Sequence, residues 1–322
     1  MAVEKNQPEE IMQGLTMEEV RAMYFDREAL IEPSYKLYQL NGGGKRYYYR
    51  YNEDGTTEFF PSVTTILSHT MPANPFLLDW MLGKGKEEAE RYRDERAAYG
   101  TFMHAQFESL LINRCYDLDL LKESLRNYIE VNKLPDNFIF YADDLKKDML
   151  AFAQFVKDYD VRPLAVEISL VSEKYGIAGM IDLPCTMKKG LKSDERVTAI
   201  VDFKSGRKGF WEEHEIQLHM YKLIWNENYP DKPVERVYNF SPKDWRKKPT
   251  YNFADQTDKK SAQKVEALLQ IAAIDEDKEE KIFTCVSGYI ALDDNDADFM
   301  NNIVSLSLSE LVKERAGKEK EQ

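Results

Sequence analysis

The sequence contains few cysteines, and none of them is placed to build a metal site or a disulfide framework. Cys115, Cys185 and Cys285 lie far apart in a chain of 322 residues, and no CxxC pair occurs. This spacing argues against a zinc ribbon or a disulfide-stapled scaffold. It fits a protein of the reducing cytosol, where free thiols persist. We therefore expect a cytoplasmic protein whose cysteines are core or neutral surface residues.

Long apolar stretches are also missing. No run approaches the roughly 20 consecutive apolar residues that a bilayer-spanning helix needs, so we expect no membrane partner. The opening residues MAVEKNQPEE lack a basic region followed by an apolar segment, so we expect no secretory signal. The phosphate-binding pattern GxxxxGK[ST] does not occur either, and this argues against a helicase motor in this chain.

Positive charge is in deficit. Against 57 acidic residues stand 44 lysines and arginines, which gives a net charge of −13. Spread evenly, this charge would repel nucleic acid. The cations are clustered, however, so composition alone leaves the partner open. The basic clusters are Lys84 with Lys86, Arg207 with Lys208, and Lys243 with Arg246, Lys247 and Lys248.

Hydrophobic periodicity and turn residues predict an α/β protein. Short tyrosine-rich runs within residues 35–60 alternate with turns at 41–44 and 52–55, which predicts an N-terminal β-meander. Strand-like runs at 164–171, 177–187, 197–204 and 234–240 surround an amphipathic helix at 211–228, a pattern that predicts a central mixed β-sheet flanked by helices. Further helices are expected at 16–31, at 63–69, from Asn74-Pro75 onward, over 84–160 with breaks at Gly100 and Leu134-Pro135, and at 261–273, followed by a strand at 282–292 and a charged terminal helix.

These elements suggest three parts of the chain. Residues 1–60 hold the first helix and the meander. Residues 61–241 form the core with a helical insertion. Residues 242–322 add a basic loop, a strand and helices that pack on the core.

The run VTAIVDFKSG, at 197–206, is the most informative segment. It is apolar enough for a buried strand, yet it ends in Asp202 and Lys204. Because side chains alternate between the two faces of a strand, these two project to the same side. Charged groups are rarely placed at a buried strand end without partners. A carboxylate beside an ammonium suits a hard metal ion and a nearby phosphate.

Four other segments carry polar groups of the same kind. Taken singly, each has an ordinary explanation: a core or surface histidine, a solvent-facing acid, a turn-forming aspartate, and an intrahelical pair. Their joint occurrence in this order is much less expected by chance. The four are His104 with Glu108 on a helix that Thr101 would begin, Glu167 within the strand-like LAVEISLV, Asp182 at the end of a glycine-rich strand, and Gln217 with Tyr221 one helical turn apart.

Together these motifs resemble the RecB-like branch of the PD-(D/E)XK nuclease superfamily, of the phage and bacterial exonuclease type. That branch carries GxxxH on a helix, GxxD and DxK on strands, and QxxxY on a helix. The matching segments run from Gly100 to His104, from Gly179 to Asp182, from Asp202 to Lys204 and from Gln217 to Tyr221. The run PSVTTIL at 61–67 is similar to an N-terminal motif of relatives. The resemblance covers about residues 61–240 and implies a restriction-endonuclease-like core.

The resemblance implies a metal-dependent DNA nuclease. Asp182 and Asp202 would bind Mg²⁺ or Mn²⁺, assisted by His104 and the backbone carbonyl of Phe203. Carboxylates suit such hard cations, and the histidine also suits Mn²⁺. Glu167 would be an additional ligand or would orient one.

The remaining motif residues would act on the substrate. Lys204 would orient or deprotonate the attacking water, or neutralise the scissile phosphate. Gln217 and Tyr221 would line the cleft, where they contact the DNA backbone or support the lysine strand. Arg207 and Lys208 directly follow the catalytic strand and would clamp a neighbouring phosphate, although a solvated loop explains them equally well.

One departure from relatives bears on cofactors. Some of these nucleases hold an iron–sulfur cluster through four cysteines, whereas this chain has three and none near the last motif. We therefore expect no iron–sulfur cluster.

The leading hypothesis is an exonuclease that acts on DNA ends in recombination, repair or phage DNA processing, in a bacterium or an infected host. A structure-specific endonuclease and an inactive nucleic-acid-binding accessory protein are the alternatives. A recombination or replication protein partner and an oligomer are both possible.

Overall fold

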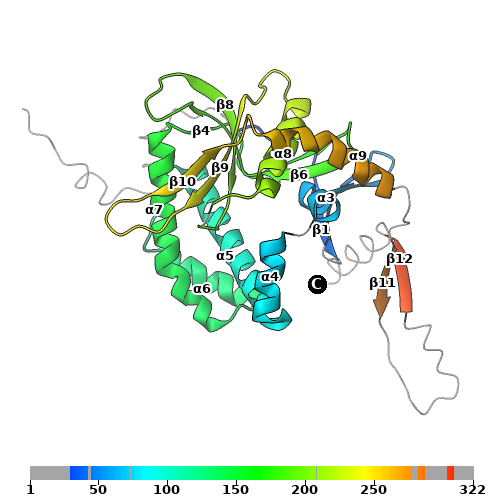
Figure 1. The fold of residues 1–322 in the computed structure, drawn as a ribbon, viewed down its shortest axis with the longest axis horizontal. Coiled ribbons are helices and arrows are strands. Elements are labelled where there is room, and N and C mark those ends of the chain that lie inside the picture. Colours follow the sequence, from blue (N-terminus) through cyan, green and yellow to red (C-terminus); the bar gives the residue numbers. More distant parts are fainter. Residues whose placement is uncertain are drawn as a thin grey trace, which may run out of the picture.

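The computed structural model describes residues 30–42, 45–72, 74–207, 209–276, 282–286 and 303–307 (Figure 1). The helix expected at 16–31 falls almost wholly outside these ranges, and so does the charged terminal helix. Within the described ranges, no helix combines the length and the apolar character that a membrane-spanning segment requires.

The predicted β-meander forms as an antiparallel sheet. Its strands follow one another in the order β1 (Tyr38–Gly42), β2 (Lys45–Tyr51) and β3 (Thr57–Pro61). Gly55 adopts a φ of 81° in the turn between β2 and β3, a conformation that glycine reaches without strain. Tyr48 and Phe60 share one face of this sheet and pack against Val171 and Ala178, which docks the meander on the rest of the molecule.

A mixed sheet of five strands lies at the centre, in the order β10-β9-β8-β7-β4. β8 (Arg196–Phe203) runs parallel to β9 (Arg236–Pro242) and antiparallel to β7 (Leu183–Lys188). The edges are β4 (Arg162–Pro163) and β10 (Tyr251–Asp255), a strand that the sequence pattern did not predict. β5 (Ile168–Ser172) and β6 (Ile177–Ile181) form a separate antiparallel pair. The single strand expected over 177–187 is therefore wrong, since it divides at Asp182.

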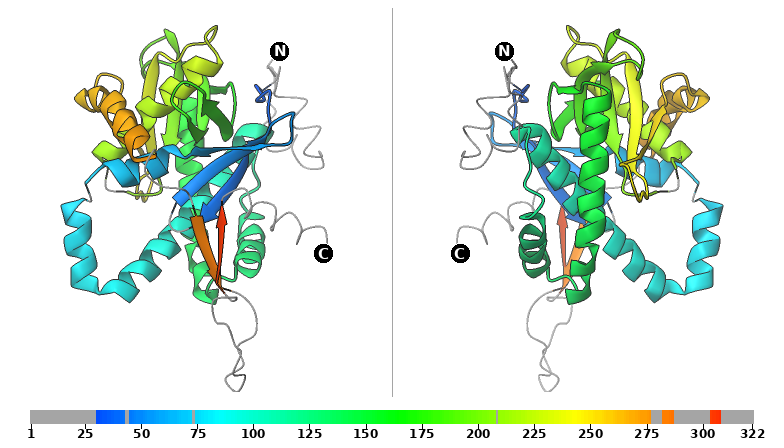
Figure 2. Two further views of the ribbon diagram at one scale, coloured as in Figure 1. Left: turned by 90° about the vertical axis from the view of Figure 1, so that its right-hand side faces the viewer. Right: turned by 90° about the vertical axis from the view of Figure 1, so that its left-hand side faces the viewer.

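Helices cover both faces of this sheet (Figures 1 and 2), which confirms the predicted fold class. The alternation along β8 explains why: Phe203 packs with Phe107 and Phe152 on one face, whereas Ile200 packs with Ile224 on the other. The first face carries α5 (Lys86–Asn113), α6 (Leu121–Asn132), η1 (Asp136–Tyr141) and α7 (Ala142–Asp158), and the second carries α3 (Val63–Thr70), α8 (Glu212–Asn228), η2 (Lys260–Lys264) and α9 (Val265–Glu276).

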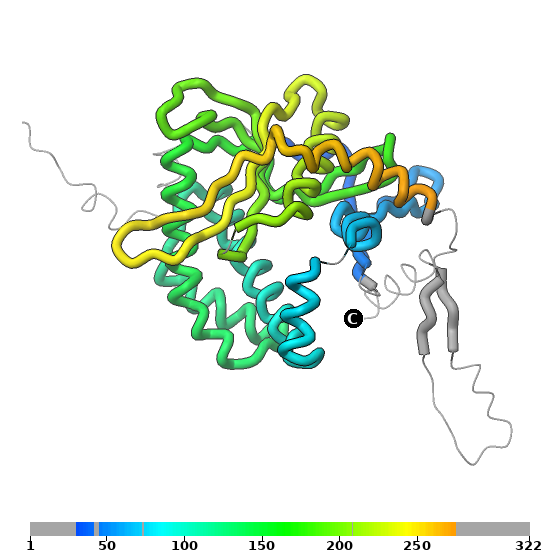
Figure 3. Tube along the Cα trace, in the orientation of Figure 1, coloured from blue at the N-terminus to red at the C-terminus, as the bar shows by residue number. Residues whose placement is uncertain are grey.

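Three elements lie away from the central layers. α4 (Pro75–Lys84) contains no buried residue, and with the first turns of α5 it projects from the body (Figure 2). β11 (Ile282–Val286) and β12 (Ile303–Ser307) pair with each other in an antiparallel hairpin. The tube in Figure 3 also shows the β9–β10 hairpin extending beside α7.

Helix boundaries agree with the capping signals but not with every predicted break. Ser62 and Asn74 cap α3 and α4 with their side chains, as the sequence indicates. The break at Leu134-Pro135 is confirmed, because α6 ends at Asn132 and its C-cap residue Lys133 is left-handed. The break expected at Gly100 is wrong: α5 continues through it. A glycine inside a helix costs only about 1 kcal/mol, which tertiary packing readily offsets.

Candidate active site

Three candidate metal ligands converge from separate elements of the fold. His104 lies on α5, Glu167 immediately precedes β5, and Asp182 lies between β6 and β7. One ligand atom from each residue lies within 4.8 Å of those of the other two. The Nδ1 atom of His104 is 3.5 Å from Glu167 Oε1 and 3.8 Å from Asp182 Oδ1. The fold thus brings together residues that are up to 78 positions apart in the sequence.

Main-chain hydrogen bonds position both acidic residues of this cluster. The Glu167 N–H donates to the Asp182 carbonyl at 2.8 Å, and the Phe203 N–H donates to Asp182 Oδ2 at 2.7 Å. The sequence pattern predicted that Glu167 lies in a strand. This is wrong, because β5 begins one residue later. Its φ of 48° is left-handed. Such a conformation is uncommon for a residue other than glycine and is concentrated at functional sites.

Asp202 and Lys204 form an ion pair beside this cluster. The Lys204 Nζ atom lies 2.8 Å from Asp202 Oδ2, which confirms that the two side chains project to the same side. The buried Asn239 also donates to Asp202 Oδ2, at 2.8 Å. Lys204 donates to Gln217 Oε1 at 3.0 Å, and Gln217 Nε2 donates to the Tyr221 hydroxyl at 2.7 Å. Gln217 and Tyr221 are nearly buried, so in this structure they hold the lysine in place.

The crowding of carboxylates changes their proton affinity. Burial raises the pKa of Asp182 well above its usual value, and the Asp202 carboxylate adds to the rise, although His104 and Lys204 oppose it. Burial lowers the pKa of His104, but the Asp182 and Glu167 carboxylates outweigh this and raise it overall. Negative charge is thus concentrated where little water reaches it, and a bound cation would relieve the repulsion.

The donor set fits a hard divalent cation. Glu167 Oε1 is buried and, among the described residues, receives no hydrogen bond. A buried acceptor without a donor is costly, and a metal ion would satisfy it. Carboxylate oxygens with one imidazole nitrogen are ligands that suit Mn²⁺, and oxygens suit Mg²⁺. Asp202 is not one of the three clustered residues, because its carboxylate faces Lys204 and Asn239.

The glycines of two motifs permit close approach of neighbouring elements. A Cβ atom on Gly179 would lie 2.7 Å from Cε1 of Tyr221, a distance that real Cβ atoms do not adopt. A Cβ atom on Gly100 would lie 3.3 Å from Oγ of Ser205, in the loop after Lys204. Both glycines are therefore packing positions around the site rather than turn residues.

The PSVTTIL segment joins the meander to the site. The Ser62 Oγ atom accepts from the Thr65 N–H at 3.0 Å and caps α3. Thr65 Oγ1 accepts from the Arg46 N–H at 2.8 Å and donates to the Arg46 carbonyl at 2.9 Å. Ser62 also forms a parallel bridge with Ala178, next to Gly179. This motif supports the strand that leads to Asp182.

Arg207, which the sequence suggested as a phosphate clamp, pairs with carboxylates of the protein in this structure. Arg207 Nη2 donates to Asp148 Oδ1 at 2.9 Å, and the Tyr99 hydroxyl donates to the other oxygen of this buried carboxylate at 2.5 Å. Arg207 Nη1 also lies 3.3 Å from Asp244. Arg207 therefore ties the loop after Lys204 to α7, and Lys208 lies outside the described residues.

Sequence reasoning missed two residues near Lys204. His214 lies three residues before Gln217 and seven before Tyr221, so all three share one stripe of α8. Its Nδ1 atom accepts from the Trp211 N–H at 3.2 Å. Burial, assisted by the charge of Lys204, lowers the pKa of His214 to about 4. The other residue is Asn239, fully buried within an apolar strand. A side-chain amide within an otherwise apolar strand is the sequence feature that could have indicated this residue.

The ring of Phe203 lies in the core, where it contacts the His104 ring edge-on at 5.6 Å between centroids. Its backbone N–H donates to Asp182 Oδ2 at 2.7 Å. The role of its carbonyl as a metal ligand stays a prediction.

Comparison with known proteins shows what this chain is similar to. No curated protein matches the chain. A solved structure titled "Crystal structure of SSO0001" is similar at 12% identity and a TM-score of 0.23, over 56% of this chain and 87% of the other. The family model of the PD-(D/E)XK nuclease superfamily matches residues 77–292, which is more than half of the sequence and includes every motif from GxxxH to QxxxY. Nucleases of this superfamily use divalent metal ions, and the chain belongs to this superfamily.

Proposed function

We propose that the protein is a metal-dependent deoxyribonuclease of the RecB-like branch, and an exonuclease in preference to an endonuclease. One observation carries the proposal. Lys204 Nζ lies 2.8 Å from Asp202 Oδ2, immediately beside the His104, Glu167 and Asp182 cluster. A lysine held beside clustered carboxylates is suited to phosphodiester hydrolysis, since the ammonium and a cation neutralise the phosphate from adjacent positions.

Each residue has a role that follows from its contacts. His104, Glu167 and Asp182 would hold Mg²⁺ or Mn²⁺, with Asp202 beside them as a further ligand. When bound, such an ion polarises the phosphate and lowers the pKa of a water molecule.

Lys204 would neutralise the scissile phosphate or orient the attacking water. Gln217 Oε1 accepts a hydrogen bond from the Lys204 ammonium, so the ammonium is oriented before substrate binds. Tyr221 holds Gln217, and Asn239 holds Asp202. These supports fix the geometry of the reacting groups, which is a large part of catalysis in any enzyme.

The decisive experiment incubates the protein with end-labelled linear DNA, single-stranded and double-stranded, with Mg²⁺, Mn²⁺ or EDTA. We expect degradation that needs a divalent ion and that is lost in Asp202→Asn and Lys204→Ala. Lys192→Ala is a matched control, since this exposed lysine lies in the β7–β8 turn at the opposite end of β8. Full activity of Asp202→Asn and Lys204→Ala would refute the assignment.

The same assay separates the alternatives. Circular single-stranded DNA has no ends, so its cleavage would identify an endonuclease. No cleavage of any DNA, together with no divalent binding in a calorimetric titration, would identify an inactive accessory protein.

The biological setting is proposed on the resemblance alone. We place the enzyme in the cytoplasm of a bacterium or phage-infected host, where it would process DNA ends in recombination, repair or phage DNA metabolism. A replication or recombination partner and an oligomeric form belong to the same proposal.

A further inference from the structure

The tip of the β9–β10 hairpin, residues 243–250, is the most basic exposed segment of the described chain. It carries Lys243, Arg246, Lys247 and Lys248 against a single carboxylate, Asp244. All four cations are exposed, and none forms an ion pair with another described residue. Asp244 itself lies 3.3 Å from the Arg207 guanidinium. In a protein with a net charge of −13, this segment stands out as a concentrated positive surface.

The topology places this tip at the edge of the sheet that carries the candidate active site. β8 and β9 are parallel, so their carboxyl ends meet at one edge. The Lys204 N–H, just past the end of β8, donates to the carbonyl of Phe240 at 2.8 Å. β9 continues for two more residues, to Pro242, and the tip begins there.

Contacts between the tip and the catalytic loop confirm this placement. Asp244 pairs with Arg207, only three residues after Lys204. The Asn252 side chain, on the returning strand β10, donates to the Arg207 carbonyl at 3.3 Å. A nucleic acid whose scissile phosphate lies at Lys204 would pass the tip within a few nucleotides, since the first tip residues are about 7 Å further along the strand direction.

The hairpin is also anchored rather than loose. At its base, the Tyr251 hydroxyl donates to Asp158 Oδ2 at 2.7 Å, at the end of α7. At its tip, the Trp245 indole N–H donates to the carbonyl of Lys147 at 3.2 Å, in the same helix. Both aromatic residues are thus used to hold the hairpin along α7 (Figure 3), so the exposed recognition groups of the tip are its cations.

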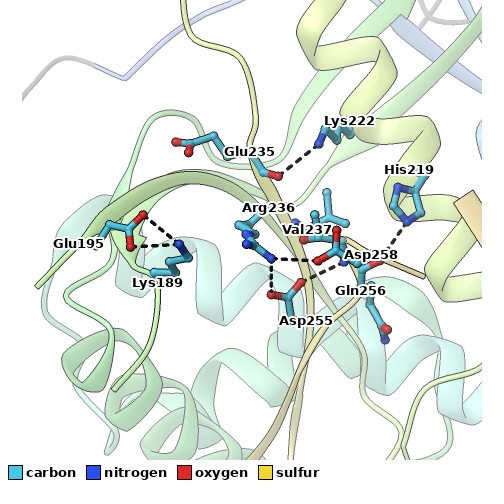
Figure 4. Close-up of polar contacts among 11 residues, drawn as sticks. Lys189, Glu195, His219, Lys222, Glu235, Arg236, Val237, Asp255, Gln256 and Asp258 are labelled. Carbon is cyan, nitrogen blue, oxygen red and sulfur yellow. Dashed lines mark hydrogen bonds and ion pairs between the residues drawn. The ribbon is translucent and has the colours of Figure 1, made fainter. Parts of the chain in front are cut away.

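The opposite end of the same sheet is different. There Arg236 is paired with Asp255 and Asp258, and Lys189 with Glu195 (Figure 4). Arg236 and Lys189 are thus paired with carboxylates of the protein, whereas Arg246, Lys247 and Lys248 at the tip have no such partner among the described residues.

We infer that Arg246, Lys247 and Lys248 form a binding surface for the sugar–phosphate backbone of nucleic acid, a few nucleotides from the cleaved bond. The inference rests on the proposed function. Exposed cations without neighbouring carboxylates bind phosphates by displacing counterions, which makes binding salt-dependent and independent of sequence. The indole N–H of Trp245 is engaged by α7, so we assign the affinity of the tip to its cations, which bind backbone phosphates without sequence choice.

The test compares R246Q/K247Q/K248Q with wild type and with K188Q/K189Q/K192Q, which removes three cations at the opposite end of the sheet. Binding of labelled 30-nucleotide and 6-nucleotide DNA, single-stranded and duplex, is measured by fluorescence anisotropy with EDTA over a range of salt concentrations. Cleavage of the same DNA with Mg²⁺ or Mn²⁺ is measured in parallel, and thermal melting confirms that both variants are folded.

For the tip variant we expect about tenfold weaker binding of the 30-nucleotide DNA near 0.1 M salt, and a salt slope shallower by about 2, since each lost phosphate contact removes about 0.7–0.9. The 6-nucleotide DNA offers the tip fewer phosphates than the 30-nucleotide DNA does, so it should lose less affinity. The control variant should resemble wild type.

An unchanged DNA affinity and salt slope in the tip variant would overturn the inference. The basic tip would then be tested for binding to an acidic protein. Equal losses in the tip and control variants would also overturn it, because they would reflect net charge alone. If wild type neither binds nor cleaves DNA, the proposed function fails first.

Discussion

Gly179 of β6 lies directly beneath the ring of Tyr221 on α8, so close that a Cβ atom there would stand 2.7 Å from Cε1 of the tyrosine. This contact links two of the sequence motifs physically. The absence of a side chain at position 179 leaves room for the Tyr221 ring, whose hydroxyl accepts from Gln217, and Gln217 in turn accepts from Lys204.

Replacing Gly179 with Ala should therefore displace Tyr221 and loosen Lys204 without unfolding the protein. We expect DNA cleavage to fall by roughly 10- to 100-fold, as misplacement of a catalytic group by about 1 Å can do. Gly190→Ala is the matched control, because a Cβ atom there meets nothing within 4 Å. Cleavage rates and melting temperatures of both variants test the prediction, and full activity of Gly179→Ala would contradict it.

Glu167→Gln should have opposite effects on stability and on metal binding. The change removes the charge from a half-buried carboxylate whose Oε1 atom is buried and accepts no hydrogen bond within the described structure. We expect the metal-free protein to become slightly more stable, by about 1 kcal/mol, and Mn²⁺ affinity to fall by about 10-fold or more. Calorimetric Mn²⁺ titration and thermal melting with EDTA measure the two effects.

Glu108→Gln is the control for that variant, since Glu108 lies near Glu167 but outside the three-residue cluster. Its Mn²⁺ affinity should stay close to that of wild type. If the two variants lose affinity equally, Glu167 is not a distinct ligand.

Arg207→Gln should destabilise the fold rather than only weaken substrate binding. It would leave the Asp148 carboxylate, which is 1% exposed, with Tyr99 as its remaining donor. Breaking a buried pair typically costs about 3–5 kcal/mol, and we expect the lower end here because the Arg207 side chain is 22% exposed. The double variant Asp148→Asn/Arg207→Gln should lose less than the sum of the single changes, because the unpaired charge is gone. Urea unfolding of the three variants gives the coupling. A normal unfolding curve with a raised KM for DNA would instead support the phosphate clamp expected from the sequence.

His214 should make stability depend on pH in the mildly acidic range. Its pKa is lowered from 6.5 to about 4 in the folded protein, first by burial and then by Lys204. The unfolded chain therefore binds the proton more tightly. The stabilisation is fully present above pH 6.5 and is lost as the pH falls toward about 4.

We expect wild type to lose about 1–2 kcal/mol over this interval relative to His214→Gln, a value reduced for partial solvent exposure. Unfolding by urea at pH 7.5, 6 and 5 measures the difference between the two proteins, so titration of other groups cancels. Parallel pH dependence in both would show that His214 is not the responsible group.

Local patterns in the sequence determined much of this protein. The meander, the caps of α3 and α4, the amphipathic α8 and the strand that ends in Asp202 and Lys204 all follow from side-chain alternation, helix period and capping residues. These depend on neighbours a few positions away. The same patterns, with the motif resemblance, indicated the α/β fold and the superfamily, and both are confirmed.

Tertiary packing decided what each motif residue touches. Glu167 adopts a left-handed φ of 48° just before β5 begins, and Arg207 pairs with Asp148, 59 residues earlier in the chain. α5 continues through Gly100, where the absence of a Cβ atom leaves room for Ser205 of the loop after Lys204. Such contacts join residues on different elements, and no local period records them. The sequence therefore determined which groups of a nuclease are present, while the three-dimensional fold decided which of them meet, since only close packing of distant elements brings their atoms within bonding distance.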